Sequence, residues 1–156
     1  MNDINYFQSA IQSGDKERVE TLIKFHPNLV NTKDGRGFTP LIFASYFGKN
    51  DIVNLLLDNN AEIDTVDASG NTALIGVSFK GNLDLVRLLI QQGANVNAQN
   101  NLGITPTIYA AMYNQSKVIK LLLKHNADIS IKDAEGKTAI DYAIEHDFKD
   151  VLELLQ

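Results

Sequence analysis

A repeat of 33 residues is the feature that most limits how this chain can fold. Residues 67–99 show one unit: a polar turn, two short apolar segments with helical spacing, and a returning loop. Three elements recur at this step through the chain: a threonine (Thr39, Thr72, Thr105, Thr138), a glycine two places earlier (Gly37, Gly70, Gly103, Gly136) and a leucine pair (Leu55 with Leu56, Leu88 with Leu89, Leu121 with Leu122, Leu154 with Leu155). A fixed period of about 20 to 50 residues indicates stacked repeats that each bury an apolar face against a neighbour.

The period divides the 156 residues into five units of one domain. We expect an N-terminal cap at 1–33, full repeats at 34–66, 67–99 and 100–132, and a C-terminal cap at 133–156. Unit one matches the others at a step of 34, with the additional residue in the loop around His26. Polar residues fill its outer side, as expected of an end cap that meets water.

The sequence of each unit predicts a turn, a helix, a second turn, a second helix and a returning loop. Asp34 and the glycine at 37 are typical of a turn, and Thr39 before Pro40 is a good helix N-cap. The first helix is expected over about 40–47 and the second over about 51–59. Residues that tolerate left-handed backbone are expected to end the first helices (Gly48, Gly81, Asn114, Asp147) and the second helices (Asn60, Gly93, Asn126).

The pattern D-x-x-G-x-T-P-L, followed by A, G, V, L-L and G-A-N, resembles the ankyrin repeat. Unit two carries it as DGRGFTPL at 34–41, and unit three carries GNTAL at 70–74 and GANVN at 93–97. The resemblance covers nearly the whole chain. It implies an all-α ankyrin repeat solenoid of about five helix-turn-helix units with short hairpin-like tips. It also implies a protein-interaction module without catalysis, and we expect a small stand-alone bacterial protein.

The chain departs from the family pattern after T-P-L, where a histidine is usual. Ile42, Ile75, Ile108 and Asp141 stand there instead, so we expect apolar packing to replace the hydrogen bonds of that histidine. Thr107 replaces a usual leucine, and Gly76 lies inside a helix at some cost in stability.

Composition limits the classes of function. The net charge of −5 and pI near 5.1 disfavour nucleic acid as a partner, because an acidic chain does not attract phosphate backbones. The absence of cysteine excludes disulfides, thiolate zinc sites and a cysteine nucleophile. No stretch approaches the roughly 20 apolar residues of a membrane span, and the start carries no signal-peptide pattern. We therefore expect a cytoplasmic protein, monomeric alone, with no membrane partner.

Candidate catalytic motifs fail on inspection. The stretch 136–138 (GKT) resembles the end of a phosphate-binding loop, but Ile131 stands where that loop requires glycine. His26, His125 and His146 lie in different units, without the converging ligands of a metal site. No pair of acids is singled out for acid–base work, and no serine and histidine form a nucleophile motif. We expect no enzyme activity, no cofactor and no metal.

The two residues before the end of each first helix are the best candidates for a binding surface. They are Tyr46 and Phe47, Phe79 and Lys80, and Met112 and Tyr113. The ankyrin resemblance implies that these places face the concave groove, and aromatic residues and methionine are enriched in binding surfaces. The alternative is that one residue of each pair packs on its neighbour and holds the stack together.

The turn at the start of each unit, called the tip below, offers a second candidate surface. Its members are Arg36, Phe38, Asn71 and Ile104, together with Ser69 and Leu102. Phe38, Leu102 and Ile104 are unusually apolar for exposed tips, although neighbouring tips can also pack on one another. Lys117, Lys120 and Lys124 share one face of a second helix, as a solvated convex face or a small basic binding stripe.

Two binding functions remain open at this point. The first is an adaptor or scaffold that binds a partner protein through the concave face and the tips. The second is a dedicated inhibitor or immunity protein that blocks a partner enzyme or toxin, which suits a small, acidic, single-domain chain.

Overall fold

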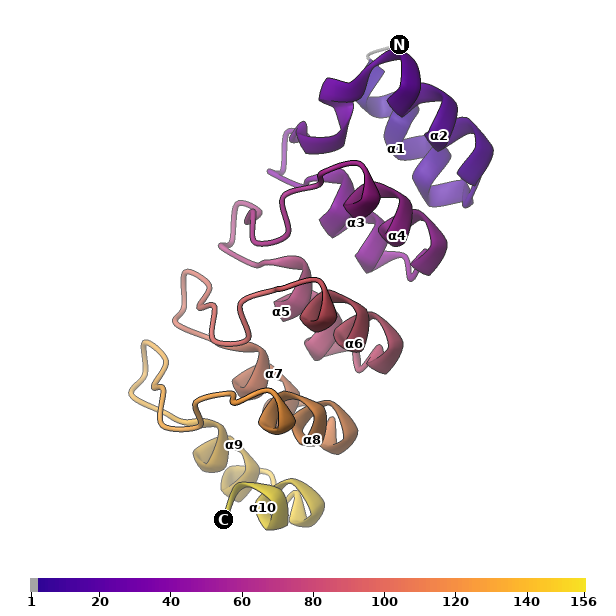
Figure 1. Cartoon of the computed structure of the whole chain (residues 1–156). Helices are drawn as coiled ribbons and strands as arrows, with labels where there is room; N and C mark the ends of the chain where they lie inside the picture. Colours follow the sequence, from indigo (N-terminus) through magenta and orange to yellow (C-terminus); the bar gives the residue numbers. More distant parts are fainter. Residues whose placement is uncertain (1–2) are drawn as a thin grey trace.

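The computed structural model describes residues 3–156 and shows five helix pairs stacked in chain order (Figure 1). The first helices of the pairs are α1 (Asp3–Ser13), α3 (Pro40–Tyr46), α5 (Ala73–Lys80), α7 (Pro106–Met112) and α9 (Ala139–Glu145). The second helices are α2 (Lys16–Phe25), α4 (Asn50–Asp58), α6 (Leu83–Gln91), α8 (Ser116–Lys124) and α10 (Lys149–Leu155). No strand occurs in this part of the chain, which confirms the predicted all-α repeat solenoid. The loop of unit one also contains a short 3-10 helix, η1 (Pro27–Asn31), which the sequence analysis did not predict.

The first helices form one continuous row. Helix α3 packs against α1 and α5, and α7 packs against α5 and α9. The second helices lie beside this row, and the loops that carry the tips extend on its other side (Figure 1). We call the surface made by the first helices and the tips the first-helix face.

The core repeats with the sequence. One leucine of each pair lies on the packed side of its second helix and is buried: Leu56, Leu89, Leu122 and, at the C-terminal end, Leu155. The other leucine of each pair is half-buried and packs against the same core. Because each helix pair is too small to enclose this apolar stripe alone, burial requires the neighbouring units.

Side-chain caps begin the first helices as predicted. Thr39, Thr72 and Thr105 accept hydrogen bonds from the N–H groups three residues later, at 3.2, 3.2 and 3.1 Å. Thr138 forms a capping box with Asp141, whose Oδ2 accepts from the Thr138 N–H at 2.8 Å. Asp141 therefore caps its own helix, α9. The three isoleucines at the same place in the other units are buried, which confirms the expected apolar packing: Ile42, Ile75 and Ile108.

Left-handed backbone follows the helices at every predicted position. The φ angle is +65° at Gly48 and +75° at Gly81, and the asparagine and aspartate that replace glycine have +57° at Asn114 and +53° at Asp147. Asn60, Gly93 and Asn126 have positive φ angles after the second helices. Short polar side chains accept this conformation because they bond locally to the backbone.

Hydrogen bonds join each tip to the next. The Ala68 N–H donates to the Arg36 carbonyl at 3.3 Å, and the two later junctions repeat this bond: Asn101 to Ser69 at 3.0 Å and Ala134 to Leu102 at 2.9 Å. The returning loops are joined similarly, through Asn31, Asp64 and Asn97, whose side chains accept from the backbone N–H of the following loop. Neighbouring tips therefore do pack on one another.

Candidate functional site

Three rings of the predicted surface are exposed on the first-helix face. Tyr46 ends α3 and is 55% exposed, Phe79 lies in the last turn of α5 and is 38% exposed, and Tyr113 follows α7 and is 49% exposed. We call these three residues the aromatic row. Soluble proteins rarely expose several large rings in sequence on one face, and such surfaces usually mark contacts with other molecules.

The rings of units three and four hold one another in place. The Phe79 centroid lies 4.5 Å from that of Tyr113 and 5.6 Å from that of Tyr109, both in edge-to-face geometry. This arrangement suits the charge distribution of aromatic rings. The contacts cross from α5 to α7, so they also contribute to the stacking of these two units.

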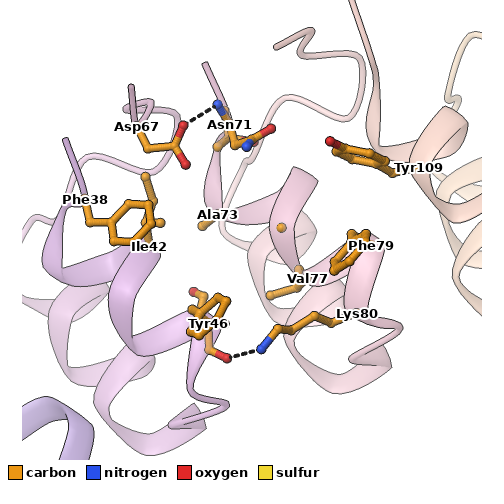
Figure 2. Close-up of a pocket in the computed structure, with 13 residues that line it drawn as sticks. Phe38, Ile42, Tyr46, Asp67, Asn71, Ala73, Val77, Phe79, Lys80 and Tyr109 are labelled. Carbon is orange, nitrogen blue, oxygen red and sulfur yellow. Dashed lines mark hydrogen bonds between the residues drawn. The ribbon is translucent and has the colours of Figure 1, made fainter. Parts of the chain in front are cut away.

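Lys80, the residue after Phe79, links α5 to α3. Its Nζ donates a hydrogen bond of 2.8 Å to the Tyr46 carbonyl and lies 3.6 Å from the centroid of the Tyr46 ring (Figure 2). A cation over a ring is an attractive pairing. The predicted site residues of units two and three are thus linked directly.

The remaining predicted residues divide into packed and exposed members. Phe47, Met112 and Phe38 are half-buried against the core. One residue in two of the three pairs therefore packs into the core, while Phe79 of the third pair is more exposed and contacts the rings of unit four. Arg36 is exposed, pairs with Asp34 at 3.2 Å and lies over the Phe38 ring.

Ile104 corrects the expectation of an exposed apolar tip. It is only 6% exposed, because its N–H is held by Asn100 Oδ1 at 3.0 Å and its side chain turns into the stack. Leu102, at the outer end of the same tip, is 60% exposed as expected. The tip backbone therefore alternates between outward and inward side chains, which residue type alone did not reveal.

A hollow of about 250 Å³ opens on the first-helix face between α3 and α5 (Figure 2). Asp67 and Asn71 lie at one end, and Lys80 and the Tyr46 carbonyl lie at the other. The hollow is lined by Phe38, Ile42, Ser45, Tyr46, Asp67, Asn71, Thr72, Ala73, Gly76, Val77, Phe79, Lys80 and Tyr109. Its size is below that of most drug-sized ligand pockets, which are about 300–1,000 Å³, and suits a single side chain.

The structure gathers half of the predicted site residues around this hollow. They are Phe38, Tyr46, Asn71, Phe79 and Lys80. A second hollow, between α1 and α3, is lined by Arg36 and Phe47 together with Phe38 and Tyr46.

The sequence did not identify Gly76, Asp67 and Tyr109 as residues of this hollow. The repeat register carried a signal for Gly76, since every other full or C-terminal unit has an aromatic residue at that step: Phe43, Tyr109 and Tyr142.

Three pKa shifts involve the tip carboxylates Asp34 and Asp133 and the Tyr142 hydroxyl of α9, which bonds to Asp133. Burial alone would raise the pKa of the Asp133 carboxyl, but the Tyr142 hydroxyl and the N–H groups of Lys137 and Glu135 bond to it and hold that pKa below its usual value. Burial and the Asp133 carboxylate raise the pKa of the Tyr142 hydroxyl. The pKa of Asp34 is also lowered: burial opposes the shift, and bonds from the Phe38 N–H, Gln8 and Arg36 outweigh it. None of these three titrating groups lines the hollow.

Nowhere in residues 3–156 do three or more His, Asp or Glu side chains gather as they would around a metal ion. Every helix in this range is too short or too polar to cross a bilayer.

The repeats of this chain match those of known proteins. A family model described as ankyrin repeats (3 copies) matches residues 7–100 and 75–156. The DNA-binding protein RFXANK of Homo sapiens is 39% identical over 62 residues, which are 40% of this chain and 24% of that protein. The DNA-binding protein RFXANK of Mus musculus is 57% identical over 35 residues, 22% of this chain and 13% of that protein. The matches thus span about a quarter of these relatives or less.

Proposed function

This chain belongs to the ankyrin repeat family, and on that basis we propose that it is a non-catalytic module that binds another protein through its first-helix face and tips. The observation that carries the proposal is the aromatic row, exposed beside the hollow between α3 and α5. Tyrosine is over-represented among the residues that dominate binding energy, and a hollow beside such rings can receive a side chain of the partner.

We propose a protein partner rather than a nucleic acid. The curated relatives are named as DNA-binding proteins, but they match only a short part of this chain. The net charge of −5 repels a phosphate backbone, and one end of the hollow carries the Asp67 carboxylate. We also propose that the protein acts in the cytoplasm, without a membrane partner, and is monomeric until it binds.

Affinity capture from a native lysate tests the proposal. The immobilised wild type is compared with the Tyr46→Ala/Phe79→Ala double variant and with a Lys117→Ala/Lys120→Ala control on α8. The wild type and the control are expected to retain the same partner, whereas the double variant loses it while remaining folded. Retention of that partner by a folded double variant would show that the first-helix face is not the binding surface.

The same experiment separates an adaptor from an inhibitor. If the captured partner is an enzyme or toxin, its activity is assayed with increasing amounts of this protein. Loss of enzyme or toxin activity with equimolar wild type, but not with the double variant, indicates the inhibitor. Unchanged activity indicates the adaptor.

A further inference from the structure

We infer that the hollow beside Gly76 is a socket for one tyrosine side chain of a partner protein, and that Asp67 accepts a hydrogen bond from its hydroxyl. This inference rests on the proposed function and narrows it to one contact. It is carried by two features of unit three that coincide nowhere else in residues 3–156: a missing ring and an unused carboxylate oxygen.

The missing ring is at Gly76. At a step of 33, Phe43, Tyr109 and Tyr142 occupy the same place in α3, α7 and α9. Gly76 lies inside α5 with no positive φ angle, and a Cβ added there would meet nothing within 4 Å. The hollow therefore includes space into which an aromatic side chain projects in other units.

Unit five shows how a tyrosine at this place is bound. The Tyr142 hydroxyl donates to Asp133 Oδ2, while Asp133 Oδ1 accepts from the Glu135 and Lys137 N–H groups of its own tip. Asp67 is the equivalent residue of unit three, two steps of 33 earlier. Its Oδ1 accepts from its own tip in the same way, at 2.8 and 3.0 Å.

The second oxygen of Asp67 is unused. No donor within residues 3–156 bonds to Asp67 Oδ2, and the side chain lines the hollow. The second side-chain atom of the other tip residues is engaged: Asp34 Oδ2 accepts from Gln8 at 3.1 Å, and Asn100 Nδ2 donates to Asn71 at 3.0 Å. Unit three thus keeps the acceptor of the tyrosine bond but lacks the tyrosine.

Other groups in the hollow suit a phenol. Asn71 has its amide oxygen occupied by Asn100, so its NH₂ group can donate to the phenol oxygen. Ile42, Val77 and Phe79 supply apolar and aromatic walls. Phenylalanine would leave Asp67 without a donor, and a cationic side chain would meet Lys80 at the opposite end of the hollow.

The test uses p-cresol, which is the tyrosine side chain as a free molecule, titrated into ¹⁵N-labelled protein and followed by NMR. Saturable shifts are expected at the amides around Gly76 and Asn71. Toluene has the same ring and methyl group without the hydroxyl. It is expected to bind at least about tenfold more weakly, because the bond to a carboxylate is lost.

Two variants test separately how the ring and the hydroxyl of p-cresol contribute to binding. Gly76→Tyr fills the hollow from within and is expected to abolish the p-cresol shifts. If this variant does not fold, Gly76→Leu is used in the same test. Asp67→Asn keeps the tip bonds, as Asn100 does in unit four, but turns the free acceptor into a donor. This variant is expected to bind p-cresol about tenfold more weakly than the wild type does, while its affinity for toluene stays unchanged.

Three results would overturn the inference. They are an absence of saturable p-cresol shifts up to its solubility, equal binding of toluene and p-cresol by the wild type, and unchanged p-cresol binding by a folded Gly76 variant. None of these results depends on capture of the natural partner. Failure of the socket is therefore distinguishable from failure of the first-helix face as a binding surface.

Discussion

Lys80 Nζ donates a hydrogen bond of 2.8 Å to the Tyr46 carbonyl and lies 3.6 Å from the centroid of the same residue's ring. Tyr46 is the last residue of α3, so its carbonyl has no partner within its own helix. One lysine of α5 thus satisfies the end of the neighbouring helix and orders a ring of the aromatic row. The surface proposed for binding is in this way coupled to the stacking of units two and three.

The Lys80→Met variant tests this coupling. It keeps an apolar stem but removes both the donor and the cation, so the free energy of unfolding is expected to fall by about 1 kcal/mol. Lys80→Arg is the matched control, since arginine can donate and stack on the ring. Urea denaturation of the three proteins measures the difference. Equal midpoints for the Met and Arg variants would mean that the contact adds no stability.

Loss of Phe79 is expected to weaken the stack without unfolding it. Phe79→Ala removes edge-to-face contacts with Tyr109 and Tyr113, each worth about 0.5–1.5 kcal/mol. The more exposed Tyr46 contributes less, so Tyr46→Ala is the milder change. For a domain of this size each kcal/mol lowers the thermal midpoint by about 2–4 °C. Circular dichroism melts check both variants, and loss of helical signal at 25 °C in either would show that these rings belong to the core.

Gly76, inside α5, and Gly81, directly after α5, are expected to respond oppositely to alanine. At Gly76 the added methyl meets no atom and the backbone is not left-handed, so Gly76→Ala should stabilise the protein by about 0.5–1 kcal/mol. At Gly81 the φ angle is +75° and the new Cβ would clash with the Gln115 side chain. Gly81→Ala should therefore destabilise by about 1–2 kcal/mol. Denaturation midpoints on the two sides of the wild type would support both assignments, and a shared direction would refute one of them.

The bond between Tyr142 and Asp133 predicts a pH dependence. Tyr142→Phe leaves the buried Asp133 carboxylate with one donor fewer, which should cost about 1–3 kcal/mol at pH 7. The pKa of Asp133 is lowered from 3.8 in the folded state, so its contribution to stability is present above about pH 4 and is lost as the pH falls through the folded pKa.

The stability difference between wild type and Tyr142→Phe should therefore shrink below about pH 4. Urea denaturation of both proteins at pH 7, 5 and 3 measures it. A difference that stays constant over this range would mean that the hydroxyl bonds equally to the protonated carboxyl.

Local chemistry could be predicted from the sequence because it depends on residues close in the chain. Thr39 caps α3, and Asn114 and Asp147 replace glycine in left-handed turns, as their side chains and stereochemistry require. The 33-residue period adds which residues share a position in successive units, and so predicts the all-α stack, its buried leucines and the exposed rings at Tyr46 and Tyr113.

The contacts between units were decided by the tertiary structure. Asp34, Asp67 and Asp133 have the same tip bonds, yet the second oxygen of Asp34 meets Gln8, that of Asp133 meets Tyr142, and that of Asp67 faces an open hollow. Ile104 is buried although its place in the tip predicted exposure. The 33-residue pattern alone determined the fold, because each unit must bury the same apolar stripe. The hollow and its free carboxylate oxygen arose only on stacking, because they depend on which side chains neighbouring units bring to a shared space.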